Sequence, residues 1–242
     1  MTQASEAVIP TNDMTLVQRR RCGRRFKDQV VKNINPLLKG TGWKRRSDWV
    51  FKAEGDWYLT AFITGRTTLP DSMANVLKLQ LGIKPMAVDP IYWRALGLHE
   101  NLKQPLSFRS NAAFKVAALP LATREWSEGL TNVKDATQTL VDALMDIAQD
   151  ALREVSSEAF SEIVQKHQDR ERYLALRWVS LIAEDKGDIA MDEVKEHYLG
   201  KERTPVGHAK MLETIDGFQR VVDGTDVPQN RRLSIDLRGT PT

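Results

Sequence analysis

The chain has 242 residues, of which 41% are hydrophobic and 28% are charged, and both fractions are typical of globular proteins. No apolar run approaches the about 20 residues needed to cross a bilayer, and the single cysteine, Cys22, excludes an intrachain disulfide. Residues 1–17 include no apolar stretch of the length found in signal peptides, so we expect a cytoplasmic protein without a membrane partner.

The net charge of +3 is distributed unevenly along the chain. Between Arg19 and Arg46 there are eleven basic residues and one acidic residue, Asp28, so this stretch carries a charge of +10. The other residues carry −7, from 24 basic and 31 acidic side chains. Such polarity indicates either a partner that recognises positive charge or pairing between two parts of the same molecule.

The first element in chain order is a helix, expected to begin near Thr15 and to end at Leu38. Its apolar residues recur at helical spacing, at Phe26, Val30, Ile34, Leu37 and Leu38. Pro36 lacks a backbone donor and clashes with the preceding turn, which predicts a break near Asn35. Gly40-Thr41-Gly42 then ends the helix, because glycine adopts positive φ angles readily.

Three antiparallel strands are predicted next, at residues 47–52, 56–64 and 77–83. The second is rich in aromatic and β-branched residues, and Ala53-Glu54-Gly55-Asp56 before it has the composition of a tight turn. In the third, apolar and polar residues alternate with a period of two, which no helix satisfies. Its apolar face has Leu77, Leu79, Leu81 and Ile83, and its polar face has Lys78, Gln80, Gly82 and Lys84. We expect the first helix to cover the apolar face.

Two further elements are predicted before residue 122. Asp89 and Pro90 are expected to open a short helix, with Asp89 as its N-terminal cap and Pro90 at the first helical position. Residues 107–121 are predicted to form a fourth strand that Pro120 closes. The alternating apolar positions of that strand are Phe114, Val116 and Ala118.

The alternation disappears after residue 122, and helical spacing replaces it. Helices are predicted at about residues 133–153, 157–168, 170–184, 188–198 and 205–222. The expected fold class is α+β, with an antiparallel sheet of three to four strands covered by the first helix and followed by an all-α region. The expected organisation is a disordered N-terminus at 1–14, an α+β domain at 15–122, a helical region at 123–222 and a disordered tail at 223–242.

Part of the α+β domain resembles a bacterial family known as DUF4304. The passage from Ile34 to Lys39, the run Gly42-Trp43-Lys44-Arg45-Arg46 and the strand from Leu77 to Ile83 follow the order found in that family. Trp43 stands where the family usually has phenylalanine, and Gln80 stands where it usually has asparagine. The resemblance covers about residues 26–120 and implies an α+β fold. The function of the family is unknown, so no catalytic residue is implied.

No recognisable catalytic constellation was found in the sequence. The four histidines are far apart and have no metal-ligand spacing, and no glycine-rich phosphate loop or nucleophile elbow is present. The pairs His167 with Glu171 and Glu196 with His197 have the composition of acid–base pairs but are also common on solvated helix faces. Cys22 has arginine neighbours that favour its thiolate, yet no base accompanies it. We therefore favour a non-enzyme, leave the question of an enzyme open, and expect no cofactor and no metal.

The basic stretch is the strongest functional candidate. Its predicted nucleic-acid-binding residues are Arg19, Arg20, Arg24, Arg25, Lys44, Arg45 and Arg46. Trp43, Trp49 and Trp57 lie nearby in the sequence, where they would either stack on bases or belong to the core. The alternative is that these basic residues form ion pairs with the acidic helical region.

The sequence therefore leads to three hypotheses about function. The first is a cytoplasmic accessory protein, possibly of the immunity type, that binds another protein without catalysis. The second is a nucleic-acid-binding protein that uses the stretch from Arg19 to Arg46. The third is an enzyme of a type that the sequence does not reveal.

Overall fold

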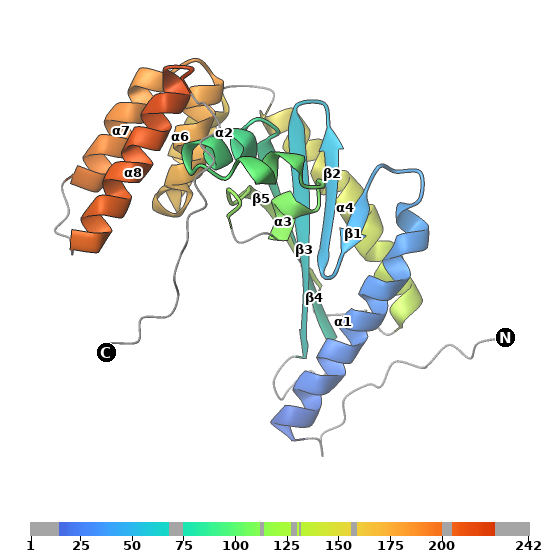
Figure 1. The fold of residues 1–242 in the computed structure, drawn as a ribbon. Helices are drawn as coiled ribbons and strands as arrows, with labels where there is room; N and C mark the ends of the chain where they lie inside the picture. Colours follow the sequence, from blue (N-terminus) through green and yellow to red (C-terminus); the bar gives the residue numbers. More distant parts are fainter. Residues whose placement is uncertain are drawn as a thin grey trace.

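A computed structural model describes residues 15–67, 75–111, 114–126, 130, 132–155, 159–199 and 205–225. Within these residues the chain forms one five-stranded antiparallel sheet and eight α-helices, which confirms the α+β class (Figure 1). The sheet has more strands than the three to four predicted. Apart from 223–225, the two segments predicted to be disordered lie outside the described residues. None of the described helices combines the length and the apolar character that crossing a membrane requires.

The sheet has the strand order β1-β2-β3-β4-β5, with neighbouring strands antiparallel. The strands are β1 (Lys44–Arg46), β2 (Trp49–Glu54), β3 (Trp57–Thr67), β4 (Asn75–Pro85) and β5 (Leu119–Trp126). The α-helices are α1 (Leu16–Leu38), α2 (Val88–Ala95), α3 (Phe108–Asn111), α4 (Val133–Val155), α5 (Phe160–Lys166), α6 (Leu174–Ala183), α7 (Gly187–Leu199) and α8 (Pro205–Val222). Two short 3-10 helices are η1 (His99–Lys103) and η2 (Arg170–Tyr173).

Helix α1 begins with a capping box and continues through its proline. The Gln18 backbone N–H donates to Thr15 Oγ1 at 3.3 Å, and the Thr15 N–H donates to Gln18 Oε1 at 2.7 Å. The break predicted near Asn35 is wrong, because Pro36 lies in the last turn, where few later hydrogen bonds depend on it. Gly40 and Gly42 have φ angles of 82° and 83°, which confirms that glycine ends this segment.

One face of the sheet is covered as the alternation predicts. Leu77, Leu79, Leu81 and Ile83 have no exposed surface, and the face that they share contacts α1 and α4. At Gly65, the cross-strand partner of Leu77, a Cβ atom would lie 2.5 Å from Cβ of Lys27 on α1. The helix therefore approaches the strand so closely that only glycine fits there.

The opposite face, on which the alternation places the polar residues of β4, is only partly exposed. At one end it is covered by α2 and α3, and there Lys84 is completely buried beside Tyr58. The other end of β3 and β4 extends past these helices in Figure 1, and there Gln80 is exposed and Phe62 is half-buried. This face is therefore covered over one part of its length only, within the described residues.

The predictions for residues 89–121 need three corrections. Helix α2 begins at Val88, and Asp89 lies buried inside its first turn and caps nothing, because its carboxylate binds Lys84. The fourth strand is not at 107–121: residues 108–111 form α3, and the strand β5 begins at Leu119. Pro120 is tolerated in β5 because this is an edge strand, with an irregularity opposite Leu81 and Gly82. Residues 44–46, which were not predicted as a strand, form β1.

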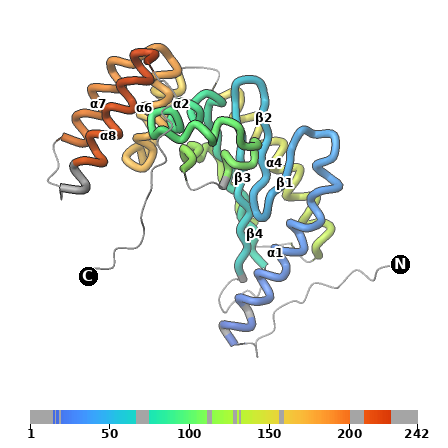
Figure 2. Tube along the Cα trace, viewed as in Figure 1, coloured from blue at the N-terminus to red at the C-terminus, as the bar shows by residue number. Residues whose placement is uncertain are grey.

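The helices after the sheet lie near their predicted positions. Helix α4 packs against α1, β4 and β5, and α6 contacts α5, α7 and α2 (Figure 2). Helix α8 in turn contacts α2 and α7. The strand β5 crosses the boundary predicted between residues 122 and 123, and α4 contributes to the same core as the sheet.

The register of β4 gives a direct stability prediction. Leu79→Ala is expected to lower the free energy of unfolding by about 2–5 kcal/mol, because a buried leucine leaves a cavity between the sheet and α1. Gln80→Ala, at the next position on the exposed part of the other face, is expected to change it by less than about 0.5 kcal/mol. Urea unfolding of both variants measures the difference, and equal losses would show that the assigned register is wrong.

Candidate functional site

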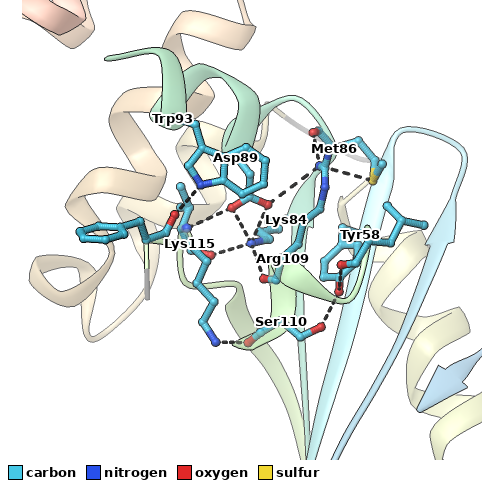
Figure 3. Close-up of polar contacts among 11 residues, drawn as sticks. Tyr58, Lys84, Met86, Asp89, Trp93, Arg109, Ser110 and Lys115 are labelled. Carbon is cyan, nitrogen blue, oxygen red and sulfur yellow. Dashed lines mark hydrogen bonds and ion pairs between the residues drawn. The ribbon is translucent and has the colours of Figure 1, made fainter. Parts of the chain in front are cut away.

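The most concentrated group of polar contacts in the described structure surrounds Lys84, at the end of β4 (Figure 3). Its ammonium Nζ donates to Asp89 Oδ1 at 2.9 Å and lies 2.8 Å from Asp89 Oδ2. It also donates to the carbonyl oxygens of Val116, at 2.6 Å, and Arg109, at 3.1 Å. Neither Lys84 nor Asp89 has any exposed side-chain surface, so this is a completely buried ion pair.

Three separate segments supply the partners of this ion pair. The turn after β4 leads directly into α2, which places Asp89 above the strand end, where Oδ1 also accepts the Val116 N–H at 3.0 Å. Arg109 on α3 donates from Nη1 to the Met86 carbonyl at 2.5 Å and lies 3.9 Å from Asp89 Oδ2. Two cations thus surround one buried carboxylate, and the three segments are held to the sheet.

Aromatic side chains enclose the ion pair. Tyr58 on β3 donates from its hydroxyl to the Leu106 carbonyl at 2.9 Å and also contacts the Ser110 hydroxyl. The Lys84 ammonium lies 5.5 Å from the centre of the Tyr58 ring, and the Arg109 guanidinium lies 5.8 Å from the centre of the Trp93 ring. These rings exclude water from the charged atoms, so the ion pair sits in a medium of low polarity.

Burial shifts the proton affinities in this cluster. It lowers the pKa of the Lys84 ammonium to about 8, although the Asp89 carboxylate acts in the opposite direction. Burial likewise lowers the pKa of Lys115 and raises the pKa of Tyr58 above its usual range. A lysine with a lowered pKa can act as a base or nucleophile where a substrate reaches it. Here no surface of Lys84 is exposed, so we assign the cluster a structural role.

The residues predicted to bind nucleic acid lie on α1 and β1. The side chains of Arg20, Arg24 and Arg25 are exposed on α1, and the backbone of Arg19 belongs to the same helix, although its side chain lies outside the described residues. In β1, Lys44 and Arg46 are exposed and Arg45 is half-buried. Among these residues, the described side chains are therefore exposed except for the half-buried Arg45, and the assignment to nucleic-acid binding stays a prediction.

A hydrogen bond connects the basic residues of the helix with those of the strand. Arg45 donates from Nε to Asn35 Oδ1 at 2.9 Å and from Nη1 to the Ser47 carbonyl at 3.0 Å. Arg21, Arg25, Lys32 and Asn35 follow one another at helical spacing, so they lie along one side of α1. We use the name basic surface for seven cations of this region. They are the exposed Arg20, Arg21, Arg24, Arg25, Lys32 and Lys44 and the half-buried Arg45.

Within the part of the chain that the structure describes, the basic surface does not pair with the acidic helices. Among the described side chains, no ion pair joins a basic residue of 20–46 to an acidic residue of 123–199. Asp28 and Asp48, which lie in and beside the basic stretch, bind Lys27 at 2.9 and 2.7 Å. Two nearby acidic groups are therefore occupied by one buried lysine, which is not part of the basic surface.

A shallow hollow of about 470 Å³ lies where α1 meets β1. It is lined by Asn35, Lys39, Lys44 and Arg45, among others, and the buried Trp43 forms part of its floor. Trp43 and Trp57 contact the core, while Trp49 stacks on Phe62 in the sheet. Trp43 and Trp57 are therefore unsuited to stacking on a ligand. Trp49 differs from them because it stacks on another ring of the sheet.

The residue pairs considered for acid–base chemistry have structural contacts. The ring of His167 lies against Tyr173, and its Nδ1 accepts the Asp169 N–H at 3.1 Å. His197 lies edge-on against Trp178. In the part of the chain that the structure describes, no three histidine, cysteine, aspartate or glutamate side chains gather as metal ligands would. These observations provide no basis for a catalytic proposal.

Comparisons with known proteins give no further guide to the site. No protein-family model matches the chain, and neither a characterised protein nor a solved structure is significantly similar to it. The resemblance of residues 26–120 to DUF4304 therefore stays a prediction.

Proposed function

We propose that the protein acts by binding a macromolecule without catalysis, and that the macromolecule is a nucleic acid held at the basic surface. The observation that carries this proposal is the set of exposed cations on α1 and β1 that have no carboxylate partner among the described residues. Phosphates supply the missing negative charge at regular spacing, and each neutralised phosphate releases a counterion.

The shape of the basic surface supports an extended ligand. Its cations follow α1 from Arg20 to Lys32 and continue through the hydrogen bond between Asn35 and Arg45 into the edge strand β1. An α-helix rises about 1.5 Å per residue along its axis, so the cations on one side of α1 form a line along the helix. A chain of phosphates matches such a line better than a small anion does.

The competing proposal is a protein partner, which was the first expectation from the sequence. A protein with an acidic surface would contact the same cations, and both proposals require the basic surface to be free. The buried cluster around Lys84 favours neither, since no ligand reaches it. Only the first proposal requires the protein to bind nucleic acid, so a binding measurement distinguishes the two.

The decisive variant replaces Arg20, Arg24, Arg25 and Lys44 by alanine, because all four are exposed and have no hydrogen bond or ion pair within the described structure. The matched control replaces Lys134, Arg172, Lys195 and Lys210, which are exposed elsewhere, so that both variants lose the same charge. Binding of a labelled strand and a labelled duplex is measured at about 50 mM salt, where phosphate contacts are strong.

We expect the natural chain and the control variant to bind with micromolar affinity, and the first variant to bind about a hundredfold or more weakly. Circular dichroism checks that all three chains are folded. Equal weakening of both variants would mean that only the net charge matters and would refute a defined surface. Absence of binding by the natural chain would refute the nucleic-acid proposal and leave an acidic protein as the partner.

A further inference from the structure

The face of the sheet opposite α1 has a part that the described helices approach only at its β1–β2 edge, where Arg46 donates to the Ser107 hydroxyl beside α3 at 3.1 Å (Figure 1). A row of cross-strand partners crosses this part, from Arg46 on β1 through Trp49, Phe62 and Gln80 to Thr123 on β5. The two aromatic residues are half-buried, and Gln80 and Thr123 are exposed. We call this part, together with the neighbouring pair Thr64 and Lys78, the open sheet face.

The aromatic pair of the open sheet face is held in place. The rings of Trp49 and Phe62 are stacked, with their centres 4.5 Å apart and an angle of 29° between their planes. The Lys115 ammonium lies 4.7 Å from the centre of the Trp49 ring. A pre-organised aromatic surface loses little conformational entropy when a flat ligand packs against it.

Positive charge surrounds this aromatic pair. Arg46 and Lys115 lie on one side of it, and Lys78 lies on the other, beside a hollow of about 350 Å³ that also includes Arg66 and Glu125. Arg66 binds Glu125 at 2.9 Å, the one acidic residue among the described residues that line the hollow. More cations than carboxylates thus surround the aromatic pair. This arrangement suits a ligand whose flat rings contact the aromatic pair and whose negatively charged groups contact the surrounding cations.

The edge strand β1 joins the open sheet face to the basic surface. Successive residues of a strand point to opposite faces, and Arg45 points toward α1, where it binds Asn35. Lys44 and Arg46 point to the other face, as the partners of Phe51 and Trp49. Positive charge is therefore continuous around the edge of the sheet, from α1 to the aromatic pair.

We propose that the nucleic acid is single-stranded, with phosphates on the basic surface and bases packed against Trp49 and Phe62 on the open sheet face. This inference rests on the proposed function and adds the class of ligand. In a duplex the bases are stacked and paired, so they cannot reach the two rings, whereas unpaired bases can. Ring contacts of this kind tolerate any sequence, because every base has an aromatic face.

The test compares Phe62→Leu, which removes the ring but keeps an apolar side chain, with Phe62→Tyr, which keeps the ring. Phe114→Leu is the matched control, since Phe114 is exposed and is not among the residues of the open sheet face. Each variant is titrated with a labelled strand of mixed sequence and with the duplex of the same sequence. Unfolding in urea checks that the variants remain folded.

We expect the natural chain to prefer the single strand. Phe62→Leu is expected to weaken binding of the single strand about tenfold, while duplex binding and the salt dependence stay unchanged, because a base contact is lost and no phosphate contact. Phe62→Tyr and Phe114→Leu are expected to bind as the natural chain does.

Two results would overturn the inference, and they are distinguishable. If the natural chain binds strand and duplex equally and Phe62→Leu changes neither, the open sheet face is not part of the site, although the basic surface is. If the natural chain binds neither form at low salt, the proposed function fails together with this inference.

Discussion

Asp89→Ala is expected to lower the free energy of unfolding by about 3–5 kcal/mol, since it leaves the Lys84 ammonium buried without its carboxylate. The ammonium would keep only the carbonyl oxygens of Val116 and Arg109 as acceptors. The Val116 N–H would also lose its acceptor. Since these contacts attach α2, α3 and the segment before β5 to the sheet, the loss should affect the cooperative unfolding of the whole domain.

The pH dependence of this variant follows from the lowered pKa of Lys84. Burial lowers the pKa of Lys84 in the folded protein to about 8, below the ordinary lysine pKa of 10.5. The stability linked to this group is therefore fully present above pH 10.5 and is lost as the pH falls through 8. Removing the carboxylate lowers the folded-state pKa further. Between about pH 7 and 8 the unfolding free energy of the variant should therefore rise with pH more steeply than that of the natural chain.

Two further variants distinguish the contribution of the ion pair to stability from that of the neighbouring hydrogen bonds. Asp89→Asn keeps an acceptor for the Val116 N–H and removes only the charge. The double variant Lys84→Met with Asp89→Leu removes both charges, and it should be more stable than the sum of the single losses predicts. Additive losses, or an Asp89→Ala variant within about 1 kcal/mol of the natural chain, would show that the ion pair is not coupled as described.

The parts of the fold that the sequence predicted are those with a clear period. The alternation from Leu77 to Ile83 gave both the strand and its buried face, and helical spacing gave α1 and α4. The fourth strand was misplaced because residues 114–118 alternate in sequence but are held in an irregular segment by Asp89 and Lys84. Local pattern could not show this, since those contacts come from distant residues.

The buried cluster was missed for a related reason. Lys84 occupies a position that alternation assigns to the polar face, and a lysine there is normally solvated. Only the folding of α2 and α3 over the end of β4 buries it. The charges of Lys84 and Asp89 are five residues apart, a spacing that has no specific meaning in sequence, so tertiary structure alone reveals the pair.

The basic stretch, unlike the buried cluster, could be found from the sequence. Composition alone placed its cations, and the structure added their exposure and the link between Asn35 and Arg45. The short strand β1 was not predicted because a turn at Ser47, with φ of 53°, reverses the chain after only three residues. That turn brings Lys44 and Arg46 onto the face of the sheet where Trp49 lies.

The second large effect concerns salt. If the basic surface contacts phosphates, added salt must weaken binding steeply, because counterions compete for both partners. Six phosphate contacts correspond to a loss of about a thousandfold in affinity for a duplex between about 50 and 200 mM salt, and somewhat less for a single strand. A complex held mainly by apolar contacts would change little over this range.

The most direct test of the account is the slope of log affinity against log salt concentration, for the natural chain and for the variant lacking Arg20, Arg24, Arg25 and Lys44. On a single strand each lost phosphate contact reduces the magnitude of the slope by about 0.7, so the account predicts a difference of about 3 between the two chains. The variant that lacks Lys134, Arg172, Lys195 and Lys210 should keep the natural slope. Identical slopes for all three chains would contradict the account.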